Sequence, residues 1–371
     1  MQQALSEPLS TLVAKRFAAA KEGGHLIFSP TQVTTIQTSG ISYQLRYCPS
    51  LAKKPSALPK PADSAQTEAQ RQGKKPDPFD SPSPELLVTD IPGQNGNADQ
   101  GYWVVLNKFP IIKNHFILAT KEWKSQTDLL ERGDLEACYA CIRSWKNNGD
   151  NGQEDGGRLF AFFNSGPESG ASQPHRHIQF LPVEDMKRTY EGGGIEGWRP
   201  LIDIVVERGQ NKGQGQSQSQ DEGFLTDDRL PFAHFVLPIP TDPSAETLHS
   251  IYISLYRAAV SAAIEGSENP AELSIQDHGP AAISHNLAMT ETVMMICPRR
   301  SENATIPIQG KEEAKGERIV EPGVIALNGT VLGGTLMVKM EGEWEELKRR
   351  PDVLGGVLGK VGFPVGGRAS L

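Results

Sequence analysis

Three polar stretches divide this chain, and they constrain its fold more than any other feature. Residues 55–86, 147–157 and 207–223 are rich in Gly, Pro, Gln and Ser. They contain too few large apolar side chains to offset the entropy of an ordered chain, so we expect mobile loops there. We expect the third stretch to be a flexible linker that separates an N-terminal half, residues 1–206, from a C-terminal half, residues 224–371.

Short β-rich runs and helical patterns follow one another irregularly between these stretches. Tyr102–Leu106 and His115–Thr120 predict a hairpin, and the periodicity of residues 129–147 predicts a helix. GRLFAFFNS and HRHIQFLPV predict two strands joined by a loop, residues 166–174. In the C-terminal half we expect strands at Phe232–Ile239 and Thr292–Cys297 and helices at Glu246–Glu265 and Glu343–Arg349. Because strand and helix do not alternate steadily, the order favours an antiparallel α+β fold over a doubly wound sheet.

Charge and composition exclude several classes of protein. The net charge is −8 and the pI is about 5.6, so we expect neither nucleic acid nor an anionic membrane as a partner. No run of about 18 apolar residues predicts a membrane span, and the N-terminus does not resemble a secretory signal. Four cysteines in 371 residues do not form a disulfide framework. We expect a cytoplasmic protein, with the nucleus also open.

The motif HRHIQ places two histidines and a glutamine on one face of a predicted strand. Side chains alternate along a strand, so His175, His177 and Gln179 point one way. Ile178 and Phe180 point the other way, and their face is the expected core. We therefore expect the three polar side chains on a surface or in a cleft.

Three interpretations of this pair of histidines compete. They could be ordinary polar residues on an exposed strand, or two ligands of a metal ion. A metal site needs a third ligand, and Leu181 and Pro182 stand where a carboxylate would be expected, so no metal ligand is predicted. In the third interpretation one histidine is a nucleophile. The preceding small residues, in NSGPESGASQ, would let backbone N–H groups approach an anion.

Gln179 decides what kind of transfer such a nucleophile would support. A histidine at this position could donate a proton to a leaving group or help water attack, whereas glutamine cannot. A phosphoryl group held on histidine beside Gln179 should therefore react poorly with water. A strong anionic acceptor such as phosphate is favoured.

Several motifs together resemble one known family. His-x-His-x-Gln after NSG and GASQ, with LNKFPIIKNHFILATKE, RYCPSLAKKP, DPFDSPSPELLV and KVGFPVG, is similar to the fungal-type diadenosine tetraphosphate phosphorylases, or ATP adenylyltransferases. These belong to the branch of the histidine-triad superfamily that includes galactose-1-phosphate uridylyltransferase. The resemblance implies a histidine-triad-like antiparallel sheet with flanking helices and two pseudo-related halves.

The resemblance also implies an activity and its ligands. Diadenosine tetraphosphate and phosphate would be converted reversibly to ATP and ADP through an adenylylated histidine, with adenylyl sulfate left open as a second substrate. A divalent cation, Mg or Mn, would accompany the polyphosphate. Small molecules are the only partners implied, and a monomer is compatible with the family.

Residue roles follow from the same resemblance. His177 would be the nucleophile, its other ring nitrogen held by a backbone carbonyl near His175, and Gln179 would bind an oxygen of the α-phosphoryl group. Val293 departs from the family, where a tryptophan is expected. The implied substrate contacts are Lys54, Asn107, Lys108, Asn164, Gly170, Ala171, Ser172, Gln173, Asn286, Thr290 and Arg299.

Other candidate features have simpler interpretations. Cys138-x-x-Cys141 lies on the apolar side of a predicted helix, so core packing is favoured over redox or zinc chemistry. His115 and His234 lie in largely apolar runs and are interpreted as structural. The remaining alternatives are a dinucleoside polyphosphate hydrolase, a uridylyltransferase or a catalytically silent nucleotide-binding protein. Gln179 argues against the hydrolase, and Arg176 argues against the uridylyltransferase, which usually has His-Pro-His.

Overall fold

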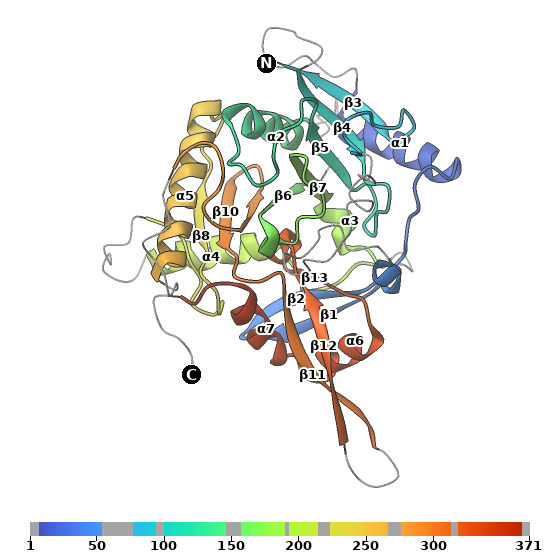
Figure 1. Ribbon diagram of the computed structural model, residues 1–371, viewed down its shortest axis with the longest axis vertical. Helices are drawn as coiled ribbons and strands as arrows, with labels where there is room; N and C mark the ends of the chain where they lie inside the picture. The colour runs from blue at the N-terminus through green and yellow to red at the C-terminus, as the bar shows by residue number, and fades with distance from the viewer. Residues whose placement is uncertain are drawn as a thin grey trace, which may run out of the picture.

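A computed structural model describes most of the chain (Figure 1). Lys54, one of the predicted substrate contacts, lies outside the described residues. Among the residues that are described, no helix is both long and apolar enough to cross a membrane. The described ranges are 7–53, 77–93, 100–145, 157–189, 193–213, 223–265, 276–312 and 318–365.

An eight-stranded sheet, in which every neighbouring pair is antiparallel, forms the centre of the molecule. The strand order is β3-β4-β5-β7-β6-β9-β10-β8. The predicted α+β class and the predicted hairpin, now β4 and β5, are confirmed. The strands are β3 (Leu87–Pro92), β4 (Gly101–Leu106), β5 (Phe116–Thr120), β6 (Leu159–Ser165), β7 (His177–Pro182), β8 (Phe235–Pro238), β9 (His285–Met289) and β10 (Val293–Pro298).

Six consecutive strands of this sheet, from β5 to the edge strand β8, have a palindromic order, β5-β7-β6 followed by β9-β10-β8. Helix α2 (Arg132–Trp145) lies between β5 and β6, and α5 (Ala245–Glu265) lies between β8 and β9. The register agrees with a pseudo-two-fold axis between β6 and β9, because Ala161 pairs with Met289 and Phe163 with Leu287. The two halves are pseudo-related, as the resemblance implied, and they share one continuous sheet.

Helices α1 (Leu9–Glu22), α2 and α5 bury their apolar side chains against one face of this sheet. Phe17, Leu135 and Tyr252 from the three helices share a core with Ile178 and Phe180 of β7. Helix α2 also buries both cysteines of its Cys-x-x-Cys sequence here, as the periodicity predicted. The intervening side chains of β7 therefore face the other side of the sheet.

A second core covers that other side. A three-stranded sheet contains β1 (Gln32–Thr38), β2 (Ile41–Tyr47) and β13 (Thr335–Val338), with β13 parallel to β2. The sequence patterns did not predict β1 and β2. The remaining elements are the 3-10 turns η1 (Pro49–Lys53), η4 (Pro167–Ser169) and η6 (Gly329–Gly333), the helices α3 (Val183–Lys187), α4 (Leu201–Gly213), α6 (Glu341–Arg349) and α7 (Val353–Val361), and the strands β11 (Asn303–Glu312) and β12 (Arg318–Ala326). The β11–β12 hairpin extends away from the body (Figure 1).

Two of the expected mobile stretches are partly ordered. The predicted linker 207–223 begins inside α4, where Gly209 packs so closely on Leu225 that an added Cβ would lie 2.9 Å from that side chain. Residues 77–86 of the stretch 55–86 have a defined conformation that leads into β3. Composition wrongly predicted mobile loops for these residues. A few contacts with other parts of the chain hold these polar segments in a defined conformation.

Candidate active site

His177 opens strand β7, and its ring is held in one tautomer. Its Nδ1 lies 2.8 Å from the carbonyl oxygen of His175. A carbonyl can only accept, so Nδ1 carries the proton and Nε2 keeps its lone pair. The hydrogen bond that was predicted between this ring and a backbone carbonyl near His175 is present. Gln126 fixes the start of the strand, because its Oε1 accepts the backbone N–H of His177 at 2.7 Å.

Burial keeps this imidazole neutral. The His177 side chain is 3% exposed, and burial lowers its pKa from 6.5 to about 4. The hydrogen bond to the His175 carbonyl opposes this shift only in part. At physiological pH the ring therefore presents an unprotonated nitrogen, which a nucleophile requires.

The two histidines are buried and do not lie on an open surface, which was one of the two expected locations. Residues at the start of the ordered segment 77–86 cover them: Asp77 Oδ2 lies 2.6 Å from His175 Nδ1, and the Phe79 ring packs 5.2 Å from the His177 ring. Thr120 Oγ1 lies 2.9 Å from His175 Nε2, so both nitrogens of this ring are occupied. Asp77 and Phe79 belong to the DPFDSPSPELLV motif, which contributed to the resemblance but predicted no place for them in the site.

The strand alternation itself is confirmed on the opposite face. Arg176 points away from the histidines toward α2, where its Nη1 lies 2.8 Å from both Asp134 and Glu131. The guanidinium is buried, and paired carboxylates offset the cost of burying its charge. Arg176 thus anchors the histidine strand to the helix behind it.

Gln179 is held by residues of the β4–β5 hairpin. Its Oε1 lies 3.1 Å from His115 Nε2, and Asn107 Nδ2 lies 3.2 Å from His115 Nδ1. Asn107, a predicted substrate contact, thus makes a hydrogen bond within the site. The neighbouring Lys108 is exposed.

The loop between β6 and β7 has the backbone that its glycines allow. Gly166 and Gly170 have φ values of 88° and 77°, which other residues rarely adopt. Ser169 Oγ donates to the Gly166 carbonyl at 2.6 Å, and the Ser169 carbonyl accepts from Asn286 Nδ2 at 2.9 Å. A Cβ at Gly170 would lie 2.8 Å from Asn328 Cβ. The C-terminal half therefore supports the predicted phosphate loop.

Two asparagines join the halves directly behind this loop. Asn164 Oδ1 accepts from Asn286 Nδ2 at 2.9 Å and from the Gly329 backbone N–H at 2.8 Å. Arg299 Nη1 donates to Asn286 Oδ1, and its Nη2 donates to the Leu327 carbonyl at 3.0 Å. The structure thus brings Asn164, Asn286 and Arg299 together in one buried network.

The remaining predicted contacts lie apart from this network. Ala171, Ser172 and Gln173 continue the loop toward His175 and are partly or fully exposed. Thr290 lies beyond the other end of β9, where its backbone N–H donates to the Val293 carbonyl at 2.9 Å. Within the described residues, no hydrogen bond joins Thr290 to the histidine face.

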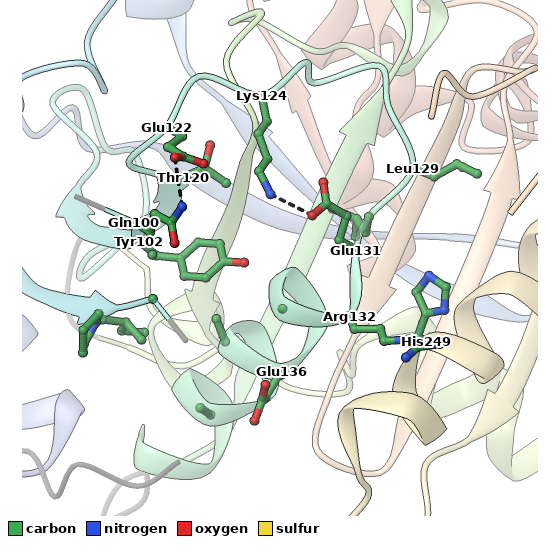
Figure 2. A pocket seen from close by; sticks show the side chains of 18 of the residues that line it. Gln100, Tyr102, Thr120, Glu122, Lys124, Leu129, Glu131, Arg132, Glu136 and His249 are labelled. Atoms are coloured by element: carbon green, nitrogen blue, oxygen red, sulfur yellow. Dashed lines mark hydrogen bonds and ion pairs between the residues drawn. The ribbon is translucent and has the colours of Figure 1, made fainter. Parts of the chain in front are cut away.

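A separate cleft of about 680 Å³ lies on the α2 side of the sheet (Figure 2). It reaches the His175 ring through Thr120 and Glu122, whose hydroxyl and carbonyl contact His175 Nε2. Lys124 and Glu131 form an ion pair across it. Within the described part of the chain, neither His177 nor Gln179 is among its lining residues.

The histidine pair is not arranged for chelation. Each Nδ1 faces an oxygen of the protein, and His175 Nε2 faces a hydroxyl. Within the described ranges, no three His, Cys, Asp or Glu side chains are grouped so that they could hold a metal ion. What the geometry offers is a neutral imidazole nitrogen, an adjacent carboxamide and a glycine-bearing loop.

Comparisons with known proteins match both halves of the chain. Residues 2–191 match the model of the Ap4A phosphorylase N-terminal domain, and residues 228–364 match that of the ATP adenylyltransferase C-terminal domain. The chain is 28% identical over 365 residues to diadenosine 5',5'''-P1,P4-tetraphosphate phosphorylase 2 of Saccharomyces cerevisiae, covering 97% of this chain and 96% of the relative. It is 27% identical to Protein APA1 of the same yeast, covering 96% of this chain and 94% of the relative.

Solved structures agree with these sequence matches. The crystal structure of yeast Ap4A phosphorylase Apa2 superposes with a TM-score of 0.69 at 26% identity, covering 97% of this chain and 99% of that chain. The crystal structure of Apa2 in complex with Ap4A matches with the same values.

Proposed function

This chain belongs to the Ap4A phosphorylase family, and from that premise we propose that it converts diadenosine tetraphosphate and phosphate reversibly to ATP and ADP. The observation that carries the proposal is the pairing of a neutral, tautomer-fixed His177 with Gln179 on one face of β7. The yeast relatives, one of them solved with Ap4A, support the choice of substrate.

The first half-reaction is an attack by His177 Nε2 on the α-phosphorus. An N–P bond forms, the bond from phosphorus to the bridging oxygen breaks, and ATP leaves with the electron pair. The developing positive charge on the ring is stabilised because Nδ1–H already donates to the His175 carbonyl. In the second half-reaction an oxygen of phosphate attacks the same phosphorus, which releases ADP and restores His177.

Gln179 and the loop account for the choice of acceptor. The carboxamide and the backbone N–H groups of Gly170–Gln173 would donate to the phosphoryl oxygens as charge builds on them. Neither can deliver a proton to the leaving group, and ATP needs none because it is stable as an anion near neutral pH. Water therefore gains no assistance, whereas phosphate arrives as a ready nucleophile.

Lysine side chains, an amide group and a metal cation would contact the polyphosphate. Lys54 and Lys108 are the proposed lysine contacts, and Asn164 Nδ2 is the amide atom left after its Oδ1 is taken by Asn286 and Gly329. A divalent cation, Mg or Mn, would enter with the polyphosphate. The four cysteines are buried free thiols, which supports the cytoplasm or nucleus as the place of the reaction.

Covalent labelling tests the proposal. The protein is incubated with diadenosine tetraphosphate carrying radioactive α-phosphorus, without phosphate, and run on a denaturing gel. We expect an acid-labile, base-stable label on the wild type and on His278→Ala, a control histidine whose side chain is 89% exposed. The label should vanish in His177→Ala, because no other nitrogen replaces Nε2.

His175→Ala should still be labelled, but more slowly, because the carbonyl that holds His177 belongs to the backbone. Addition of phosphate should discharge the label as ADP. Label on His177→Ala equal to that of the wild type would overturn the covalent assignment, and loss of the label as AMP regardless of phosphate would favour a hydrolase.

A further inference from the structure

The carboxamide of Gln179 is the last member of a hydrogen-bond chain whose direction can be worked out. The chain begins at the backbone of the β4–β5 turn, where the Phe109 N–H lies 2.9 Å from Asn107 Oδ1. A backbone N–H can only donate, so the atom that faces it must be the carboxamide oxygen. The Asn107 amide is therefore fixed, with its Nδ2 toward His115.

The tautomer of His115 follows from this orientation. Asn107 Nδ2 lies 3.2 Å from His115 Nδ1 and has only hydrogens to offer, so Nδ1 accepts. The proton of the neutral ring is then on Nε2, which lies 3.1 Å from Gln179 Oε1 and donates to it. The oxygen of Gln179 is thereby taken, and its NH₂ group is the part turned away from His115.

We propose that His115 is a positioning residue that makes Gln179 present N–H donors, rather than its oxygen, to the phosphoryl group on His177. In the reverse orientation the Gln179 oxygen would face phosphoryl oxygens, and the interaction would change from attraction to repulsion. This role rests on the proposed function, since that function supplies the phosphoryl group. It replaces the structural role that its apolar surroundings suggested for His115.

The surroundings of His115 make the chain rigid. Its side chain is 8% exposed and lies 6.5 Å from the Phe162 ring, measured between centroids. The Asn107 backbone N–H donates to the His115 carbonyl at 3.0 Å, so the two residues are also tied through the main chain. Ile117, two residues on, pairs with Gln179 across β5 and β7.

The C-terminal half contains a natural comparison. His234 precedes β8 as His115 precedes β5, in AHFVL and NHFIL respectively. The Asp227 backbone N–H donates to His234 Nε2 at 2.9 Å, so this ring carries its proton on Nδ1, which donates to the Phe232 carbonyl at 2.8 Å. The residue that corresponds to Gln179 is Met295, since β8 pairs with β10 at Val236 and Met295. The opposite tautomer occurs where there is no glutamine to orient.

Nitrogen NMR of the full chain tests the tautomer without any activity. In protein labelled with ¹⁵N-histidine, long-range proton–nitrogen spectra near pH 7 distinguish the two neutral tautomers. We expect the Nε2–H form for His115 and the Nδ1–H form for His177 and His234, with signals assigned by His115→Gln and His234→Gln. An Nδ1–H form or a doubly protonated ring at His115 would overturn the proposal.

Kinetics of two substitutions then test the positioning role. His115→Phe keeps a ring but removes the donor, so we expect kcat for phosphorolysis to fall by about tenfold or more with a smaller change in KM. His115→Gln can return an N–H to the Gln179 oxygen and should recover most of this loss. The matched change His234→Phe should lower thermal stability and leave kcat within about twofold.

The outcomes separate this proposal from the proposed function. Equal kcat values in His115→Phe and His115→Gln, whether reduced or not, would show that the imidazole donor has no part in orienting Gln179. If the wild type carried out no adenylyl transfer, the proposed function would fail, while the NMR spectra would still decide the tautomer.

Discussion

We assign two groups to the phosphoryl centre, His177 Nε2 and the Gln179 NH₂ group. Each is oriented by a hydrogen bond made by another atom of the same side chain. His177 Nε2 is unprotonated because Nδ1 donates to the His175 carbonyl. The Gln179 NH₂ group is turned outward because its oxygen accepts from His115. At the scale of single residues, the chemistry therefore depends on atoms that do not touch the reacting phosphorus.

Replacing Gln179 by histidine should change the acceptor. Gln179→His supplies a proton donor beside the adenylyl group, so we expect AMP to appear without phosphate, at least about tenfold above wild type. Chromatography of products at increasing phosphate concentrations measures this. Gln179→Leu is the control, which should slow turnover without producing AMP. A phosphate dependence unchanged in Gln179→His would contradict our account of the glutamine.

Much of the site could be predicted at the residue scale, and the rest depends on contacts between distant parts of the chain. The motif itself indicated His177, His175 and Gln179, because alternation and chemical type are local properties. Asp77 could not be inferred in this way, because it meets His175 across 98 positions of sequence. The positioning role that we propose for His115 could not be predicted either, because it depends on hydrogen-bond direction.

At the scale of elements, strands and helices with a regular apolar spacing were predictable. Segments held in place by a few long-range contacts were not. The helix at residues 246–265 and the hairpin around residue 110 were found to within about two residues because their apolar spacing is regular. Strands β1 and β2 were missed, and residues 77–86 were expected to be mobile. That segment is fixed by the burial of Phe79 and the contact of Asp77 with His175, which composition does not reveal.

The loop between β6 and β7 offers a test at this scale. Gly170→Ala places a Cβ at φ 77° and 2.8 Å from Asn328 Cβ, so we expect a loss of about 1–2 kcal/mol in the free energy of unfolding and a raised KM. Urea unfolding and steady-state kinetics measure both. Gly356→Ala, in the exposed part of α7 with no atom within 4 Å, should be neutral or stabilising by up to about 1 kcal/mol. Identical unfolding of Gly170→Ala and wild type would refute the strain.

The whole molecule should lose stability as the pH falls from about 6.5 to 4. Burial lowers the pKa of His177 and of His285 to about 4, and it also lowers the pKa of His234. The unfolded chain binds these protons near pH 6.5, so in this window it holds more protons than the folded chain. Each histidine whose pKa falls from 6.5 to about 4 on folding should lower the free energy of unfolding by about 3 kcal/mol once the pH reaches 4.

Urea unfolding at a series of pH values measures this loss. His285→Phe, outside the proposed site, should reduce proton uptake on unfolding by about one proton. A free energy of unfolding that stays constant between pH 6.5 and 4.5 would contradict the buried neutral histidines.

The palindromic order of the strands from β5 to β8 has a consequence for the orientations in which the proposed substrate can bind. The register maps His177 onto Val293 and Gln179 onto Met295, so only one side of the two-fold frame carries the residues proposed for the chemistry. The substrate that we propose for the protein, diadenosine tetraphosphate, is symmetrical and has two interchangeable adenosine ends. The dinucleotide can therefore bind in either of its two end-to-end orientations and present an equivalent α-phosphorus to the single proposed nucleophile.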